Sequence, residues 1–230
     1  MYFGVIKMEK RINENLMNYV ENELYPIYET FDRGHDVNHI HAVIERALDI
    51  AKTMEDIDIN IVYASAALHD IGIKVERKNH AIHSAEFVLT DPKLKKFFTE
   101  EEIKLIANAV EDHSTSKGIE PRSIYGKIVC DADKDDDLEI SLLRAYEWTK
   151  KYMPELTEEE CIKNVYNQMV FKFGTEGKVQ FWINTPKQRA FLEQMRALSQ
   201  NEEQFMECLH SILTSDNRTM ILEKEGTQDV

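Results

Sequence analysis

Apolar residues recur at steps of three and four along most of this 230-residue chain. That spacing is the period of one face of an α-helix, so each such stretch is expected to form an amphipathic helix. The chain has only 8 Gly and 5 Pro, which is few for the tight turns of a β-sandwich or barrel. The pattern therefore predicts an all-α fold, built as a helical bundle.

Helix boundaries follow from the apolar period and from capping signals. The expected helices cover residues of about 10–31, 36–54, 61–68, 80–90, 99–113, 122–133, 138–152, 157–173 and 185–213, with a short extended piece at 179–183. Two capping boxes mark helix starts, Thr99 with Glu102 and Thr157 with Glu160. The run 61–68 is apolar almost all round, which is typical of a helix in the middle of a bundle.

The charge balance excludes several classes of partner. Lys and Arg number 28 and Asp and Glu number 42, which gives a formal net charge of −14. Binding to nucleic-acid backbones or to anionic membranes needs a basic surface, so neither partner is expected. No apolar run reaches the roughly 18–20 residues of a membrane span, and the first ten residues become charged too soon for a signal peptide. The three cysteines are scattered and form no CxxC, so we expect a cytoplasmic protein; the sequence sets no oligomeric state.

Histidines are concentrated in one part of the chain, with seven of the eight between positions 35 and 113. His69-Asp70 ends the apolar helix, which places two ionisable groups where apolar packing stops. Five carboxylates lie within 131–137, and they repel one another unless solvent or a cation screens them. Each feature alone is typical of solvated residues. The ordered set of His39, His69-Asp70 and Asp133, each on or beside a predicted helix, indicates a metal site.

Three stretches of the chain resemble the HD superfamily of metal-dependent phosphohydrolases. They are Gly34-His-Asp-Val-Asn-His39-Ile-His-Ala-Val43, Ala67-Leu-His69-Asp70-Ile-Gly72 and Ile128-Val-Cys-Asp-Ala-Asp133-Lys. The resemblance implies an HD-domain core at about 34–140, preceded by an N-terminal helix at 1–33 that packs on it. Helices at 141–213 are expected to complete the same domain, and residues 214–230 are expected to form a frayed tail.

The resemblance also implies which residues bind metal. The family's metal quartet falls on His39, His69, Asp70 and Asp133. The ligands of a second metal, found in some members, fall on His80 and His113. His83 lies one turn from His80 and is an alternative to it. The mixed nitrogen and oxygen donors suit Mn²⁺, Fe²⁺, Co²⁺, Ni²⁺ or Mg²⁺, as one ion or two.

Residues expected to act on the substrate follow from the same resemblance. Asp70 is expected to orient the attacking water as well as to bind metal. Lys74 comes one residue later than the lysine of many members, and it is expected to act in catalysis and in phosphate binding. Arg33 and Lys134 are expected to contact the substrate. Lys134 replaces the family's usual Arg, so it offers a point charge in place of a two-pronged guanidinium.

The expected function is hydrolysis of a phosphate ester or anhydride in a small metabolite or nucleotide by a metal-activated water. The enzyme would be a phosphatase, a phosphodiesterase or a nucleotide pyrophosphohydrolase. Two alternatives stay open. A di-iron oxygenase would use the same six ligands, and air-sensitive activity with bound iron would identify it. A non-catalytic helical binding or regulatory module would need no metal chemistry.

Overall fold

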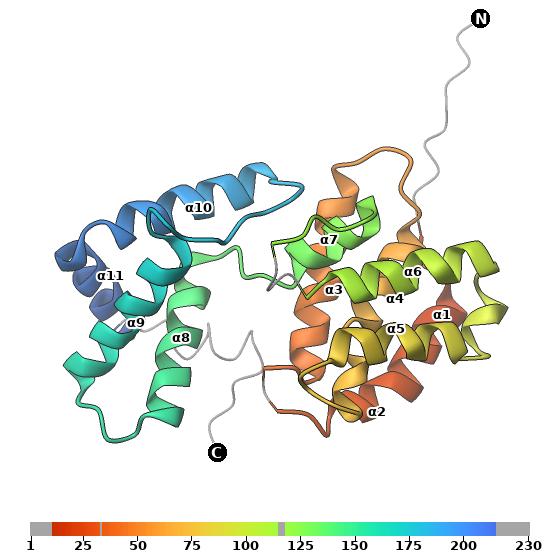
Figure 1. Ribbon diagram of the computed structural model, residues 1–230, viewed down its shortest axis with the longest axis horizontal. Coiled ribbons are helices and arrows are strands. Elements are labelled where there is room, and N and C mark those ends of the chain that lie inside the picture. The colour runs from red at the N-terminus through yellow and green to blue at the C-terminus, as the bar shows by residue number, and fades with distance from the viewer. Residues whose placement is uncertain (1–10, 33, 115–117, 215–230) are drawn as a thin grey trace, which may run out of the picture. The chain divides into compact units, whose positions relative to one another are not determined.

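The computed structural model describes residues 11–32, 34–114 and 118–214 (Figure 1). Every regular element in these ranges is a helix, so the predicted all-α class is confirmed. The chain folds as two compact units, one ending at Asp133 and the other beginning at Lys134. The boundaries expected at 33, 140 and 213 stay predictions.

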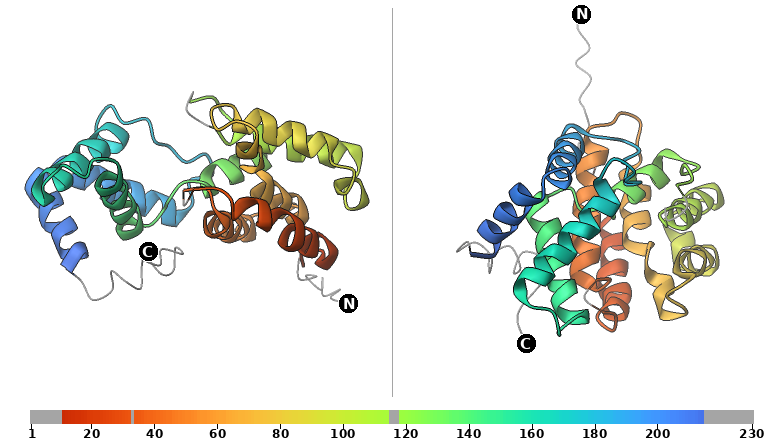
Figure 2. Two further views of the ribbon diagram at one scale, coloured as in Figure 1. Left: turned by 90° about the horizontal axis from the view of Figure 1, so that it is seen from below. Right: turned by 60° about the vertical axis from the view of Figure 1, so that its left-hand side comes forward.

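The first unit is a bundle of α-helices with short π and 3-10 segments. Its elements are α1 (Glu14–Tyr19), a π-helix (Val20–Leu24), α2 (Tyr25–Tyr28), α3 (Val37–Lys52), α4 (Ile59–Leu68), a 3-10 helix (Ile71–Lys74), α5 (His80–Thr90), a 3-10 helix (Leu94–Lys96), α6 (Glu100–Asp112) and α7 (Ile124–Ala132). Each residue from Ile61 to Leu68 is buried, as the all-round apolar run predicted. Helix α4 packs against α3, α6 and α7, and α5 runs beside α6 (Figure 2).

Helix ends agree with most of the capping signals. Asp36 caps α3 by accepting the backbone N–H groups of Asn38 and His39. The capping boxes of Thr99 and Thr157 both form. The first expected helix is helical without a break from Glu14 to Tyr28, but it contains a π-helical segment, in which the Tyr25 N–H donates to Val20 O. Pro26, which lacks an N–H, follows directly and prevents the ordinary helical bond at that point.

The second unit contains four longer helices around one apolar core. They are α8 (Leu138–Tyr152), α9 (Glu158–Phe173), α10 (Pro186–Ser199) and α11 (Glu202–Thr214). The single helix expected at 185–213 is therefore wrong. It is broken at Asn201, whose side chain accepts the Gln204 backbone N–H and so favours a new helix start. The piece at 179–183 does not form a strand.

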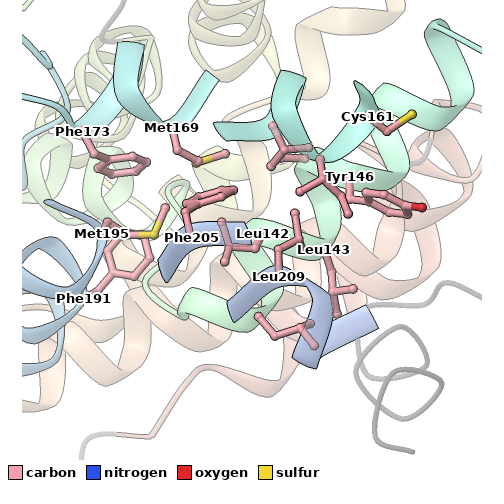
Figure 3. Close-up of a cluster of buried hydrophobic side chains, with 14 of the residues drawn as sticks. Leu142, Leu143, Tyr146, Cys161, Met169, Phe173, Phe191, Met195, Phe205 and Leu209 are labelled. Atoms are coloured by element: carbon pink, nitrogen blue, oxygen red, sulfur yellow. The ribbon is translucent and has the colours of Figure 1, made fainter. Parts of the chain in front are cut away.

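The core of the second unit is apolar and rich in aromatic rings (Figure 3). Phe173 and Phe181 both meet Phe191 edge to face, at centroid distances of 5.6 and 6.2 Å. Such edge-to-face contacts are favourable beyond the apolar area that they bury. Phe205 from α11 is fully buried against Tyr166 of α9. In the described part of the chain, no helix is long and apolar enough to cross a membrane.

Candidate metal centre

Helix ends in the first unit bring six ionisable side chains together. His39 lies in the first turn of α3, and His80 begins α5. The other four follow helix ends: His69 and Asp70 after α4, His113 after α6 and Asp133 after α7. Side chains at helix ends reach beyond the packed cylinders, so residues 94 positions apart in sequence can meet at one point. All six residues expected as metal ligands are thus in one cluster.

Asp70 is the centre of this cluster, because its two carboxylate oxygens face different histidines. Oδ2 lies 3.3 Å from His69 Nε2 and 3.7 Å from His39 Nε2. Oδ1 lies 3.3 Å from His80 Nε2 and 3.4 Å from His113 Nε2. One carboxylate that faces two groups of nitrogen donors has the arrangement needed to bridge two cations.

Asp133 completes the first of these groups. Its Oδ1 lies 3.2 Å from His39 Nε2 and 3.5 Å from His69 Nε2. One ligand atom from each of His39, His69 and Asp133 lies within 4.8 Å of the others. The same holds for His69, Asp70 and His113. Either set of three could hold a metal ion.

Backbone carbonyls fix the tautomers of three of these histidines. His69 Nδ1 lies 2.8 Å from Ala66 O, His80 Nδ1 lies 2.8 Å from Arg77 O, and His113 Nδ1 contacts Val110 O. A carbonyl only accepts, so each Nδ1 must carry the proton and donate it. In the neutral ring Nε2 then presents a lone pair, which is the form that binds a metal.

The histidine Nε2 atoms that face the centre of the cluster have no well-placed hydrogen-bond partner within the protein. His80 Nε2 and His113 Nε2 face each other at 3.0 Å, where two lone pairs repel unless a proton or cation lies between them. His39 Nε2 and His69 Nε2 are buried and make no hydrogen bond of good geometry, although the carboxylates are near. Unpaired buried polar atoms are costly. A divalent cation would satisfy them, so the residues present fit a metal.

The charges in the cluster act on each other strongly because they are buried. Burial raises the pKa of Asp70, but the imidazoles of His69 and His113 prevail and hold it well below the usual value. Burial likewise opposes ionisation of Asp133, yet His39 and His69 keep its pKa well below the usual value. Both carboxylates are therefore ionised near neutral pH, as ligands must be.

The histidines divide into two kinds. Burial lowers the pKa of His39, and burial together with His113 lowers the pKa of His80, so both rings are neutral near pH 7. Burial also acts to lower the pKa of His69, but Asp70 and Asp133 outweigh it and raise that pKa well above its usual value. A cation that binds His69 Nε2 must therefore displace a proton.

The cationic residues expected to bind substrate are not part of this cluster. The Lys74 ammonium lies 4.2 Å from the centroid of the Phe87 ring. Lys134 belongs to the second unit, where its ammonium lies 5.7 Å from the Phe181 centroid. Arg33 lies outside the described residues. His83, the alternative to His80, turns to Glu86, with Nδ1 3.0 Å from Oε2.

The acidic run at 131–137 separates into different roles. Of its five carboxylates, Asp133 faces the histidines and Asp131 is buried in α7. Asp135 pairs with Arg144 at 2.8 Å, and Asp136 pairs with Lys187 at 2.7 Å. Asp137 caps α8.

Gly72 is a site residue whose role the sequence reasoning missed. A Cβ atom there would lie 2.2 Å from His80 O and 2.5 Å from Ser84 N, which no real side chain tolerates. Glycine therefore allows α5 to approach the chain after Asp70, and Ser84 Oγ accepts the Gly72 N–H at 2.8 Å. This close approach brings His80 to Asp70. Its signal in the sequence is the glycine that follows His69-Asp70-Ile71.

The chain was compared with known protein families, curated proteins and solved structures. Residues 36–138 match the HD domain family. Among solved structures, the chain is similar to a predicted HD superfamily hydrolase from an uncultured Thermotogales bacterium, with 24% identity, a TM-score of 0.49, and coverage of 74% of this chain and 92% of that one. No curated protein matched the chain. Residues 36–138 of this chain thus match the family that its three motif stretches resemble.

Proposed function

We propose that this protein is a metal-dependent phosphohydrolase acting on a small phosphorylated metabolite or nucleotide. The observation that supports it most is the Asp70 carboxylate, which faces histidine nitrogens through both of its oxygens. His39, His69 and Asp133 would hold one ion with Asp70, and His80 and His113 would hold a second through the same carboxylate. We also propose that the protein acts in the cytoplasm without binding nucleic acid generally.

The chain's own residues have distinct tasks in this proposal. A bound divalent cation neutralises phosphoryl oxygens and lowers the pKa of a water molecule. Asp70 and Asp133 supply negative charge that holds such a cation, and the carbonyl-fixed imidazoles aim their Nε2 atoms at it. Asp70 also orients the proton of the attacking water. Lys74 would contact the phosphate only after its ammonium leaves the Phe87 ring.

A second candidate function is oxygen chemistry at a di-iron pair. The six-residue arrangement favours it specifically, since His80 and His113 face Asp70 Oδ1 beside the first group. Mixed imidazole and carboxylate donors suit iron as well as manganese. Activity that requires iron and oxygen, and that Mn²⁺ does not restore, would favour this candidate over hydrolysis.

The test begins with metal analysis of the purified protein. The protein is then stripped of metal and assayed on phosphomonoesters, phosphodiesters and nucleotides with Mn²⁺, Mg²⁺ or Co²⁺. We expect metal-dependent release of phosphate or pyrophosphate, lost in Asp70→Asn. The matched control is Asp49→Asn, an exposed aspartate on α3 that pairs with Lys52. Absence of any metal-dependent hydrolysis across the panel would contradict the proposal.

A further inference from the structure

Helix α4 ends at the metal cluster, and two side chains replace its missing backbone bonds. The last carbonyls of a helix have no partner within it. Ala66 O accepts the Nδ1 proton of His69 at 2.8 Å. Ala67 O accepts the hydroxyl proton of Tyr28, also at 2.8 Å. Tyr28 comes from α2, a separate part of the chain, and its side chain is fully buried.

The same phenol acts on Asp70. The Tyr28 hydroxyl lies close enough to Asp70 that both the backbone amide and the charge of Asp70 act on the pKa of the phenol. Asp70 itself has φ −106° and ψ 2°, in the sparsely populated region between helix and strand where many active-site residues lie. Tyr28 thus joins the last turn of α4 to the residue that has just left it.

We propose that Tyr28 is a positioning residue, whose hydroxyl fixes the backbone of Asp70 so that both carboxylate oxygens face the histidine groups. This inference rests on the proposed metal site and extends it to a residue outside the HD-domain match. The carboxylate can bridge only if its Cα–Cβ bond has the observed direction. That direction is set by the backbone, which the phenol holds at the Ala67 carbonyl, three residues before Asp70.

Packing alone does not explain a tyrosine at this position. The Tyr28 ring meets Phe31 edge to face at a centroid distance of 5.4 Å, and a phenylalanine would make the same ring contact. A buried hydroxyl is costly unless it is hydrogen-bonded, so its presence in the core needs a partner that benefits. The partner here is the Ala67 carbonyl, two residues before His69 at the end of α4.

The test compares Tyr28→Phe with Tyr63→Phe. Tyr63 is a matched control, because it is also a buried tyrosine and it lies within α4, seven residues before Asp70. Mn²⁺ affinity is measured by calorimetry on metal-free wild type and both variants, with thermal unfolding of the metal-free forms. We expect Tyr28→Phe to weaken Mn²⁺ binding about 10-fold, as for other partners of metal ligands. Tyr63→Phe should keep the wild-type affinity.

The outcomes separate this inference from the proposed function. If wild type binds Mn²⁺ and both variants bind it equally well, Tyr28 is only a core residue and the inference fails while the metal site stands. If wild type binds no Mn²⁺, the proposed function fails and takes the inference with it. A changed absorption spectrum of the Co²⁺ form in Tyr28→Phe alone would support the inference.

A second measurement applies if Tyr28→Phe does not fold. Fluorotyrosine is placed at position 28 of the otherwise unchanged chain, and in a separate sample at position 63. Titration with diamagnetic Zn²⁺ should shift the fluorine resonance at position 28, because metal binding pulls on Asp70 and its amide. A resonance at position 28 that moves no more than the one at position 63 would overturn the proposal.

Discussion

The two units of this protein bury different kinds of side chain. The second unit fills its interior with Leu, Phe, Met and Ile, and its aromatic rings contact one another (Figure 3). The first unit has a comparable apolar core but also buries His39, His69, Asp70 and His113. Both units use the same helical periodicity and the same capping devices. In the first unit, helix ends lie close together so that ionisable groups meet; among the described residues, both groups that could hold a metal lie there.

That difference has an energetic consequence. Burying apolar surface stabilises a fold at roughly 25 cal/mol per Å². Burying an ionised group costs free energy unless a partner of opposite charge offsets the lost hydration. We therefore expect a bound cation to stabilise the first unit, because it would offset the cost of the buried ionised groups. Variants that affect one unit and not the other test this comparison.

The largest expected effect is loss of hydrolysis in Asp70→Ala. This change removes both carboxylate oxygens that face the histidines, so metal retention and water orientation fall together. Loss of several kcal/mol of transition-state stabilisation corresponds to about 1,000-fold or more in rate. Metal content and hydrolysis rate are the measurements, with circular dichroism to verify folding. Retained metal and activity would mean that the His69-Asp70 pair is not the site of hydrolysis.

The next effect concerns the second unit. Phe205→Ala removes a fully buried ring, and such substitutions cost about 3–5 kcal/mol of unfolding free energy. Phe171→Ala is the control, since that side chain is 82% exposed and its loss should change stability by less than about 0.5 kcal/mol. Denaturant unfolding measures both. Mn²⁺ affinity should stay unchanged in Phe205→Ala, and a large drop would show that the metal site depends on the second core.

Metal binding should stabilise the first unit. At Mn²⁺ concentrations 100 times the dissociation constant, the gain is about 2.7 kcal/mol. It should shrink as the pH falls, because the ligand histidines must be free of protons at Nε2. The raised pKa of His69 in the metal-free protein adds to this effect. A proton held on His69 competes with the cation for Nε2, and this competition grows stronger as the pH falls. Thermal unfolding with and without Mn²⁺, at several pH values, measures the gain. A gain independent of pH would contradict histidine ligation.

Much of this architecture could be predicted from the sequence, because it depends on local signals. The apolar period gave the helical class, and the run 61–68 gave the central helix. The break at Asn201 was missed because Asn can also occur inside helices. Its side chain acts as a helix cap, accepting the Gln204 N–H, only where the backbone leaves the helical conformation. The π-helix before Pro26 was missed since the apolar period continues through it.

The sequence predicted the clustered ionisable residues of the candidate site better than the residues that position them. Ordered His and Asp residues beside helix ends pointed to His39, His69, Asp70 and Asp133, and the resemblance to the HD superfamily added His80 and His113. The sequence could not show that His80 faces Asp70 while His83 turns to Glu86, because both lie on the same helix and differ only in rotation. Tyr28 gave no signal, since a tyrosine in an apolar stripe resembles any core aromatic.

The smallest expected effect is that of Lys74→Ala. Lys74 ends the short 3-10 helix that follows Asp70, and it faces Phe87, so metal content should not change. If its ammonium leaves that ring to contact the phosphate, the variant loses one charge-assisted bond, about 2 kcal/mol or roughly 30-fold in kcat/KM. Lys78→Ala is the control, an exposed lysine four residues further along the chain. Equal rates in both variants would remove Lys74 from the substrate contacts. Loss of metal in Lys74→Ala would instead mean that the cluster depends on charges beyond its six members.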